Sequence, residues 1–148
     1  MSEPKKKTTK RRDVIGKIAS MPALAMPAAF AAAAGMKLPD TTLAESQAKL
    51  AKEPFGDHRV FFEGPTDQLK LMVAGSLRLK AGMTPHPPHK HPEEEFMVVT
   101  EGTGEIGLEG KKTKVAPGSI MYCGANKFHD ILNTGKTPLL FYYFKWLK

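Results

Sequence analysis

Residues 82–102 of this chain read GMTPHPPHKHPEEEFMVVTEG, a histidine-rich stretch that runs directly into a hydrophobic segment. Because side chains alternate between the two faces of an extended strand, His89 and His91 point the same way and can bind one metal ion together. Glu93 and Glu95 share that parity, so geometry alone leaves both carboxylates as candidate ligands. Imidazole suits zinc, copper, iron and nickel, and an added carboxylate suits iron and manganese. The spacing therefore predicts a metal site.

Two sequence patterns resemble the motifs of the cupin family. Residues 89–102, H-K-H-P-E-E-E-F-M-V-V-T-E-G, are similar to the first cupin motif, and His129 followed by Asn133 is similar to the second. The resemblance singles out Glu95 among the acidic residues and gives it a second, catalytic role in exchanging a proton. It implies one divalent first-row transition metal (iron, manganese, nickel, copper or zinc), held by His89, His91, Glu95 and His129.

The match to the cupin motifs departs from the family pattern in two places. Gly82 lies one residue further from His89 than the usual leading glycine. Gly124 and Asn126 stand where proline and glycine are usual in the second motif. Because turn residues replace turn residues, we expect these loops to differ while the ligands stay in register.

The first 35 residues resemble a twin-arginine export signal. A basic segment containing Arg11 and Arg12 precedes an uncharged, alanine-rich stretch at 18–36, and cleavage is expected after Ala31 or Ala34. Residues 1–35 carry a net charge of +5 of the total +7, so most of the positive net charge lies in this segment. We therefore expect a periplasmic or extracellular protein with no nucleic-acid partner and no stable membrane insertion after cleavage.

The rest of the chain predicts an all-β fold. Residues 36–58 are interpreted as a linker with one short helix from Leu43 to Glu53, opened by a capping box of Thr42 and Glu45. Residues 59–148 show short alternating segments separated by glycine and proline turns, which predicts a small antiparallel β-barrel or jelly roll, the cupin architecture. The expected strands are 59–63, 71–80, 95–100, 105–109, 113–115, 119–122, 128–132 and 139–147.

Residues outside the proposed ligand set are expected to have structural positions, in the core, at an interface or on the surface. The segment 139–147 is apolar on both faces, which predicts that a second copy covers one of them in a homodimer. Cys123, the only cysteine, is expected to be a buried small side chain and no ligand. His58 is expected to be structural. His86 is close enough in the sequence to support the metal ligands from behind, but a solvent-exposed loop position is favoured. The acidic residues expected to be solvated are Glu93, Glu94 and Glu101.

Three classes of function fit a site of three imidazoles and one carboxylate. The first is an exported metal-dependent enzyme on a small organic molecule, with an oxygenase acting on an aromatic or enol substrate favoured because coordination positions stay open. The second is a lyase, isomerase or hydrolase that uses the same ligands without redox chemistry. The third is a non-catalytic module that binds a sugar, a small acid or a metal. One fold supports all three.

Overall fold

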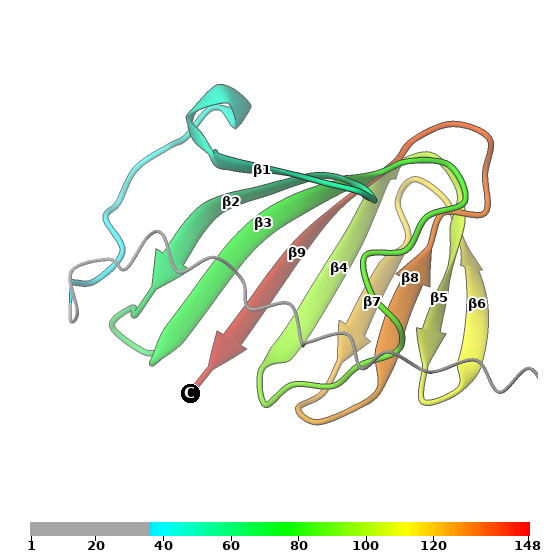
Figure 1. Ribbon diagram of the computed structural model, residues 1–148. Coiled ribbons are helices and arrows are strands. Elements are labelled where there is room, and N and C mark those ends of the chain that lie inside the picture. Colours follow the sequence, from blue (N-terminus) through cyan, green and yellow to red (C-terminus); the bar gives the residue numbers. More distant parts are fainter. Residues whose placement is uncertain (1–35) are drawn as a thin grey trace, which may run out of the picture.

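The computed structural model describes residues 36–148, which form nine strands in two antiparallel sheets (Figure 1). The larger sheet has the order β1-β2-β3-β9-β4-β7, and the smaller has the order β6-β5-β8. Their bounds are β1 Lys49–Glu53, β2 Gly56–Gly64, β3 Leu71–Leu79, β4 Glu94–Glu101, β5 Gly104–Leu108, β6 Lys111–Val115, β7 Ile120–Cys123, β8 His129–Leu132 and β9 Leu139–Leu147.

The all-β prediction is confirmed, and each of the eight expected strands has its counterpart between β2 and β9. The last strand, Leu139–Leu147, has the bounds that the sequence predicts, and it lies in the middle of the larger sheet between β3 and β4. Its central place explains why it is apolar on both faces near its start, since it pairs along both edges and packs on the core.

The extent of the predicted helix at Leu43–Glu53 was wrong. Only a single 3-10 turn forms, Glu45–Gln47, and its capping contact runs from the Ala44 amide to Gln47 Oε1. The remainder of that segment is β1, which pairs with β2 and alternates between half-buried and exposed side chains. A thin apolar stripe gives a helix little to bury, whereas a strand gains pairing along the edge of the sheet. Among residues 36–148, no helix is long and apolar enough to cross a membrane.

The core lies between the two sheets. The larger sheet contributes side chains from β3, β4, β7 and β9, and the smaller sheet contributes Ile106, Val115 and Ile131. The inward faces of neighbouring strands line up by register, so that Met97 of β4 lies between Tyr143 of β9 and Met121 of β7. One step further along β4 on the same face stands Glu95, between Lys145 and Cys123. A carboxylate therefore replaces an apolar side chain at the edge of the core.

The loop between β3 and β4 crosses in front of the larger sheet and is tied to the smaller one (Figure 1). Gly82 donates its amide to the Asn133 carbonyl at 3.0 Å, and Asn133 donates to the Met83 carbonyl at 3.0 Å. His89 and His129 exchange two main-chain hydrogen bonds of 3.1 and 2.9 Å. These bonds extend the pairing of β8 onto the loop and fix where its histidines lie.

Asn133, the last residue of the second sequence motif, has a structural role. Its side chain is fully buried, donates to the carbonyls of Leu79 and Thr137, and accepts the amide of Gly135. It therefore joins the end of β3 to the turn between β8 and β9. These three bonds hold the ends of the segments that carry the site in place.

Candidate metal centre

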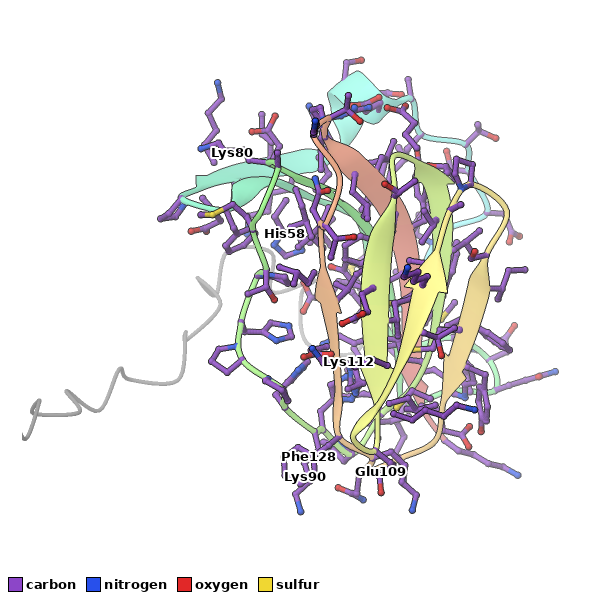
Figure 2. The ribbon with its side chains drawn as sticks, turned by 90° about the vertical axis from the view of Figure 1, so that its right-hand side faces the viewer. His58, Lys80, Lys90, Glu109, Lys112 and Phe128 are labelled. Carbon is purple, nitrogen blue, oxygen red and sulfur yellow. The ribbon has the colours of Figure 1, made fainter. Side chains whose placement is uncertain are left out.

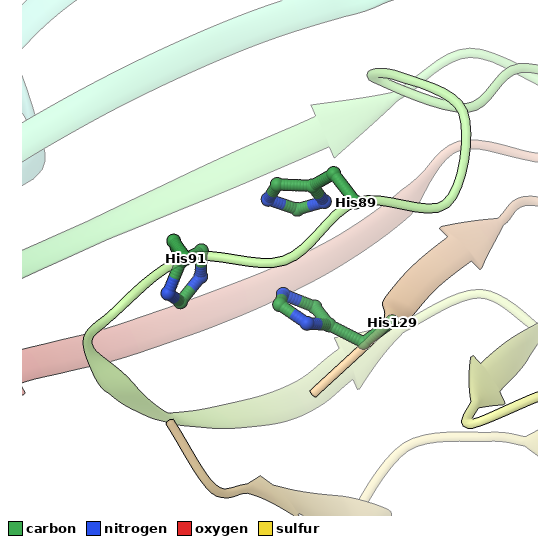
Figure 3. A group of neighbouring side chains, drawn as sticks. All are labelled: His89, His91 and His129. Atoms are coloured by element: carbon green, nitrogen blue, oxygen red, sulfur yellow. The ribbon is translucent and has the colours of Figure 1, made fainter. Parts of the chain in front are cut away.

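Three histidine side chains converge at the end of the core (Figure 3). His89 and His91 come from the loop before β4, and His129 comes from the first position of β8. One ring nitrogen of each lies within 4.8 Å of the others. His129 is buried, and His89 and His91 are half-buried, so the cluster opens towards the side on which the loop lies. A group of three imidazoles at this spacing can surround one metal ion.

Glu95 stands directly beside this cluster. Its Oε2 atom lies 2.9 Å from Nε2 of His91 and 3.1 Å from Nε2 of His129. The carboxylate is buried and is 5% exposed. The structure thus brings together all four side chains that the sequence singled out, His89, His91, Glu95 and His129. The role of each as a ligand, and of Glu95 in catalysis, stays a prediction.

Two of the imidazoles are oriented by hydrogen bonds from their outer nitrogens. Nδ1 of His91 lies 3.1 Å from the Glu93 carbonyl, and Nδ1 of His129 lies 3.0 Å from the Lys127 carbonyl. A carbonyl oxygen can only accept, so each Nδ1 carries the proton and donates it. Each Nε2 faces the Glu95 carboxylate and is the atom that would bind a metal ion. This is the arrangement by which metal-binding histidines are usually held.

Unpaired buried nitrogens show that the cluster suits a cation. Within the described chain, Nδ1 of His89 and Nε2 of His129 are buried and make no hydrogen bond of good geometry, although Glu95 lies within ion-pair distance of the latter. Buried polar atoms without partners are rare in folded proteins and call for an explanation. An ion bound among the histidines would coordinate these lone pairs. The residues present therefore fit a divalent transition metal.

The electrostatics of the cluster keep its ligand groups in binding-competent forms near neutral pH. Burial alone would raise the pKa of Glu95, but its contacts with His129 and His91 outweigh this and lower it to about 2. Burial, together with neighbouring imidazoles, lowers the pKa of His89 to about 4. Burial opposes charge on His129 as well, yet the contact with Glu95 outweighs it and raises the His129 pKa. Glu95 is therefore ionised, His89 is neutral and His129 competes for a proton.

The expectation that Glu93, Glu94 and Glu101 are solvated was wrong for two of them. The side chain of Glu93 is only 13% exposed, with Oε2 3.2 Å from Nδ1 of His91, on the outer side of that ring. Glu94 is half-buried and accepts hydrogen bonds from the Tyr122 hydroxyl and the Trp146 indole. Glu101 is exposed and pairs with Arg78. In a regular strand the side chains of Glu93 and Glu95 would lie on the same face. Strand β4 begins only at Glu94, so Glu93 lies before the strand and does not follow this alternation of side chains.

Three contacts around the histidines differ from, or add to, what the sequence favours. Cys123 is buried as predicted, and its Sγ lies 3.4 Å from Nδ1 of His129. His86, expected in a solvent-exposed loop, is half-buried with its ring centroid 3.7 Å from that of His89. Asn126, where the family usually has glycine, adopts a positive φ of 59° and donates its amide to the His91 carbonyl at 2.8 Å. Only the last could be anticipated, since asparagine tolerates the left-handed conformation.

His58 lies on the inward face of β2, away from the three-histidine group. Its Nε2 atom is 2.8 Å from the hydroxyl of Tyr143, a buried residue of β9 (Figure 2). The Tyr143 ring lies over Gly75, where a Cβ atom would come within 2.4 Å of it. Burial raises the pKa of Tyr143, so the phenol stays protonated. The pair gives the interior a polar spot on the same sheet face as Glu95.

Comparison with known proteins agrees with this architecture. The sequence pattern of the cupin domain matches residues 75–144. Among solved structures, KdgF from a Halomonas species is similar with a TM-score of 0.62 and 18% identity, covering 74% of this chain and 96% of that one. An RmlC-like cupin from Shewanella frigidimarina has a TM-score of 0.62 and 13% identity, covering 76% and 96%. A protein from Thermotoga maritima described as a predicted oxalate decarboxylase has a TM-score of 0.57 and 20% identity, covering 73% and 100%. No curated protein matches the chain.

The fold and the sequence match together define the class of this protein. It has the two-sheet cupin fold, with a group of three histidines that can hold a metal ion. The sequence match to the cupin domain, residues 75–144, contains all four candidate ligands. Structural similarity at these identities establishes the fold alone, so the reaction has to be argued from the site.

Replacing Glu95 with glutamine should weaken zinc binding by at least about tenfold, because the side chain keeps its size and loses the charge that faces the two imidazoles. Isothermal titration of the metal-free protein measures the change. Glu101→Gln is the matched control, since that carboxylate is on the same strand but is exposed and pairs with Arg78 away from the histidines. Equal losses in the two variants would contradict the assignment of Glu95.

Zinc affinity should fall as the pH is lowered. In the metal-free protein the raised pKa of His129 means that this ring keeps a proton that the metal must displace, whereas His89, with a pKa of about 4, offers no competition until much lower pH. Each displaced proton weakens apparent affinity by about tenfold per pH unit below the pKa of its group. Chelator competition at about pH 7.5 and about pH 5.5 tests this. Equal affinity at both would be inconsistent with a histidine centre.

Proposed function

We propose that this protein is an exported, mononuclear metal-binding cupin that acts as a metal-dependent enzyme on a small organic molecule, with oxygenase chemistry favoured. The observation that supports it is the convergence of three imidazoles on a buried, ionised carboxylate, with two buried ring nitrogens lacking partners. Four protein groups leave one or two positions for water, dioxygen or a substrate oxygen on a five- or six-coordinate ion.

The residues around the cluster have distinct roles in this proposal. His89, His91, His129 and Glu95 would hold the ion, and bound iron would supply dioxygen chemistry or bound zinc a Lewis acid. Glu95 is ionised, so its second oxygen can accept a proton from a substrate hydroxyl. The buried side chains next to it on the core face, Met97 and Met121, keep water away from that side.

The substrate side of the proposal rests on the inward face of the larger sheet. Tyr143 and His58 form a hydrogen-bonded pair beside the apolar core. A mostly apolar wall with one polar spot suits a small organic molecule that carries a carbonyl or hydroxyl group. This favours an enol or aromatic alcohol over a highly charged compound.

Export is proposed from the sequence of residues 1–35, which lie outside the described residues. Twin-arginine signals resemble this segment, and that route, as the resemblance implies, carries folded proteins. The metal would then be inserted before export, where the cell controls which ion is available, instead of outside, where copper and zinc win on affinity. Mass spectrometry of the protein from its producing cells should show a chain that begins after Ala31 or Ala34, and an intact Met1 would contradict this.

Oxygen uptake is the direct test of the favoured reaction. We expect the iron(II)-loaded protein to consume dioxygen when supplied with catechol or an enolisable diketone, and the zinc-loaded protein to consume none, because zinc has no redox chemistry. An oxygen electrode measures the rate, with His129→Ala as the control that lacks a ligand. Substrate loss without oxygen uptake would indicate a non-redox enzyme, and a thermal shift without any turnover would indicate a binding module.

We also propose a homodimer formed through the outer face of the larger sheet. Phe96, Ile120 and Tyr122 are 40%, 66% and 50% exposed there, and the ring of Phe96 packs against those of Tyr122 and Trp146. A second copy would remove this apolar surface from water, in keeping with the apolar character of the segment 139–147 on both faces.

Light scattering at micromolar concentration should give the mass of a dimer, and Ile120→Lys should shift it towards the monomer because a charge would be buried in the interface. The matched control is Leu50→Lys, an exposed apolar residue on the opposite edge of the sheet, which should leave the mass unchanged. A monomeric wild-type protein would contradict the proposal.

A further inference from the structure

The three histidines of the candidate metal centre are not held in the same way. His91 and His129 each donate an outer nitrogen to a main-chain carbonyl, so both rings are fixed in orientation. His89 has no such bond: within the described chain neither of its ring nitrogens has a hydrogen-bond partner, and its Nδ1 is buried. A metal-binding histidine normally needs a neighbour that holds its ring. Something else must orient His89.

His86 is the side chain that occupies this place. Its ring stands edge-on to His89, with the centroids 3.7 Å apart and the planes at 65°. It lies outside the group of three whose ligand atoms approach within 4.8 Å of one another. Its contact with the centre is therefore through the ring of His89, against which it packs directly.

The backbone around His86 holds the ring in that position. Residues 84–88 read TPHPP, and their three prolines lack an amide hydrogen and cannot pair with a neighbouring strand. The main-chain hydrogen bonds that tie the loop to the smaller sheet lie on either side, at Gly82 and Met83 and at His89. Between these points the Thr84 hydroxyl donates to the His86 carbonyl at 2.9 Å, and Nδ1 of His86 lies 3.0 Å from the Pro87 carbonyl.

We propose that His86 is a positioning residue of the metal centre: its ring, packed against His89, replaces the missing hydrogen bond and holds the His89 imidazole in its binding orientation. This inference rests on the proposed metal site. In this proposal the His89 imidazole is held by the shape of the His86 ring and not by its nitrogens. Phenylalanine at position 86 should therefore hold His89 as well as histidine does, and alanine should not.

Release of zinc from the loaded protein to a chromogenic chelator in excess tests the proposal. We expect His86→Ala to release zinc at least about tenfold faster than the wild type, as is usual when a neighbour of a ligand is lost. His86→Phe should release it at close to the wild-type rate. The matched control is Lys90→Ala, in the same loop, because Lys90 is exposed and its Nζ lies over the Phe128 ring at 5.1 Å, at the outer end of the molecule (Figure 2).

Two results would overturn the role of His86. One is a wild-type release rate in His86→Ala, and the other is a rate in His86→Phe as fast as in His86→Ala, which would show that a nitrogen is required. Thermal melting of the metal-free variants identifies any effect that comes from unfolding of the domain. His129→Ala separates this inference from the function on which it rests: if that variant still binds zinc with full stoichiometry, the metal site itself is wrong, whatever His86 does.

Discussion

The two main-chain hydrogen bonds between His89 and His129 are the contact on which the rest of the site depends. They are 3.1 and 2.9 Å long and join a loop of the larger sheet to the first residue of β8 in the smaller one. They set the position of His89 directly against His129, and the bonds of Asn133 and Asn126 hold the loop on either side. With them, side chains from both sheets face Glu95 at the edge of the core. A metal bound here would link the two layers of the fold, so binding and stability should be coupled.

Other residues around this contact hold the loops in place and orient the histidine rings. Asn133 anchors the turns on one side, Asn126 fixes the His91 carbonyl on the other, and carbonyls orient two of the three rings. The negative charge of Glu95 is stabilised by the imidazoles it faces, and it would meet a cation at that same position. Such a pairing of a buried carboxylate with several imidazoles would be costly if its only purpose were stability. Its presence points to a bound ion.

The sequence predicted most of the fold and the four residues of the candidate centre, for physical reasons that can be named. Strand alternation and glycine turns are local properties, so β2 to β9 were visible in the pattern, and the spacing of His89, His91 and Glu95 is local as well. The helix predicted at 43–53 was too long because β1 forms by pairing with β2. The local sequence preference for helix or strand gives no information on that pairing. The sequence did not favour His86 as a neighbour of the ligands and did not indicate Cys123, because their contacts depend on loop closure and on strand register.

The cupin fold leaves the reaction open. The possible reactions are narrowed by the combination of an ionised carboxylate with three imidazoles beside a mostly apolar interior. The direct test of the centre is anomalous X-ray scattering from crystals of the cobalt-loaded protein, which locates the ion without reference to activity. We predict a single cobalt peak bonded to imidazole nitrogens of His89, His91 and His129 and to an oxygen of Glu95. Cobalt bound elsewhere, or bound there without His129, would contradict this account.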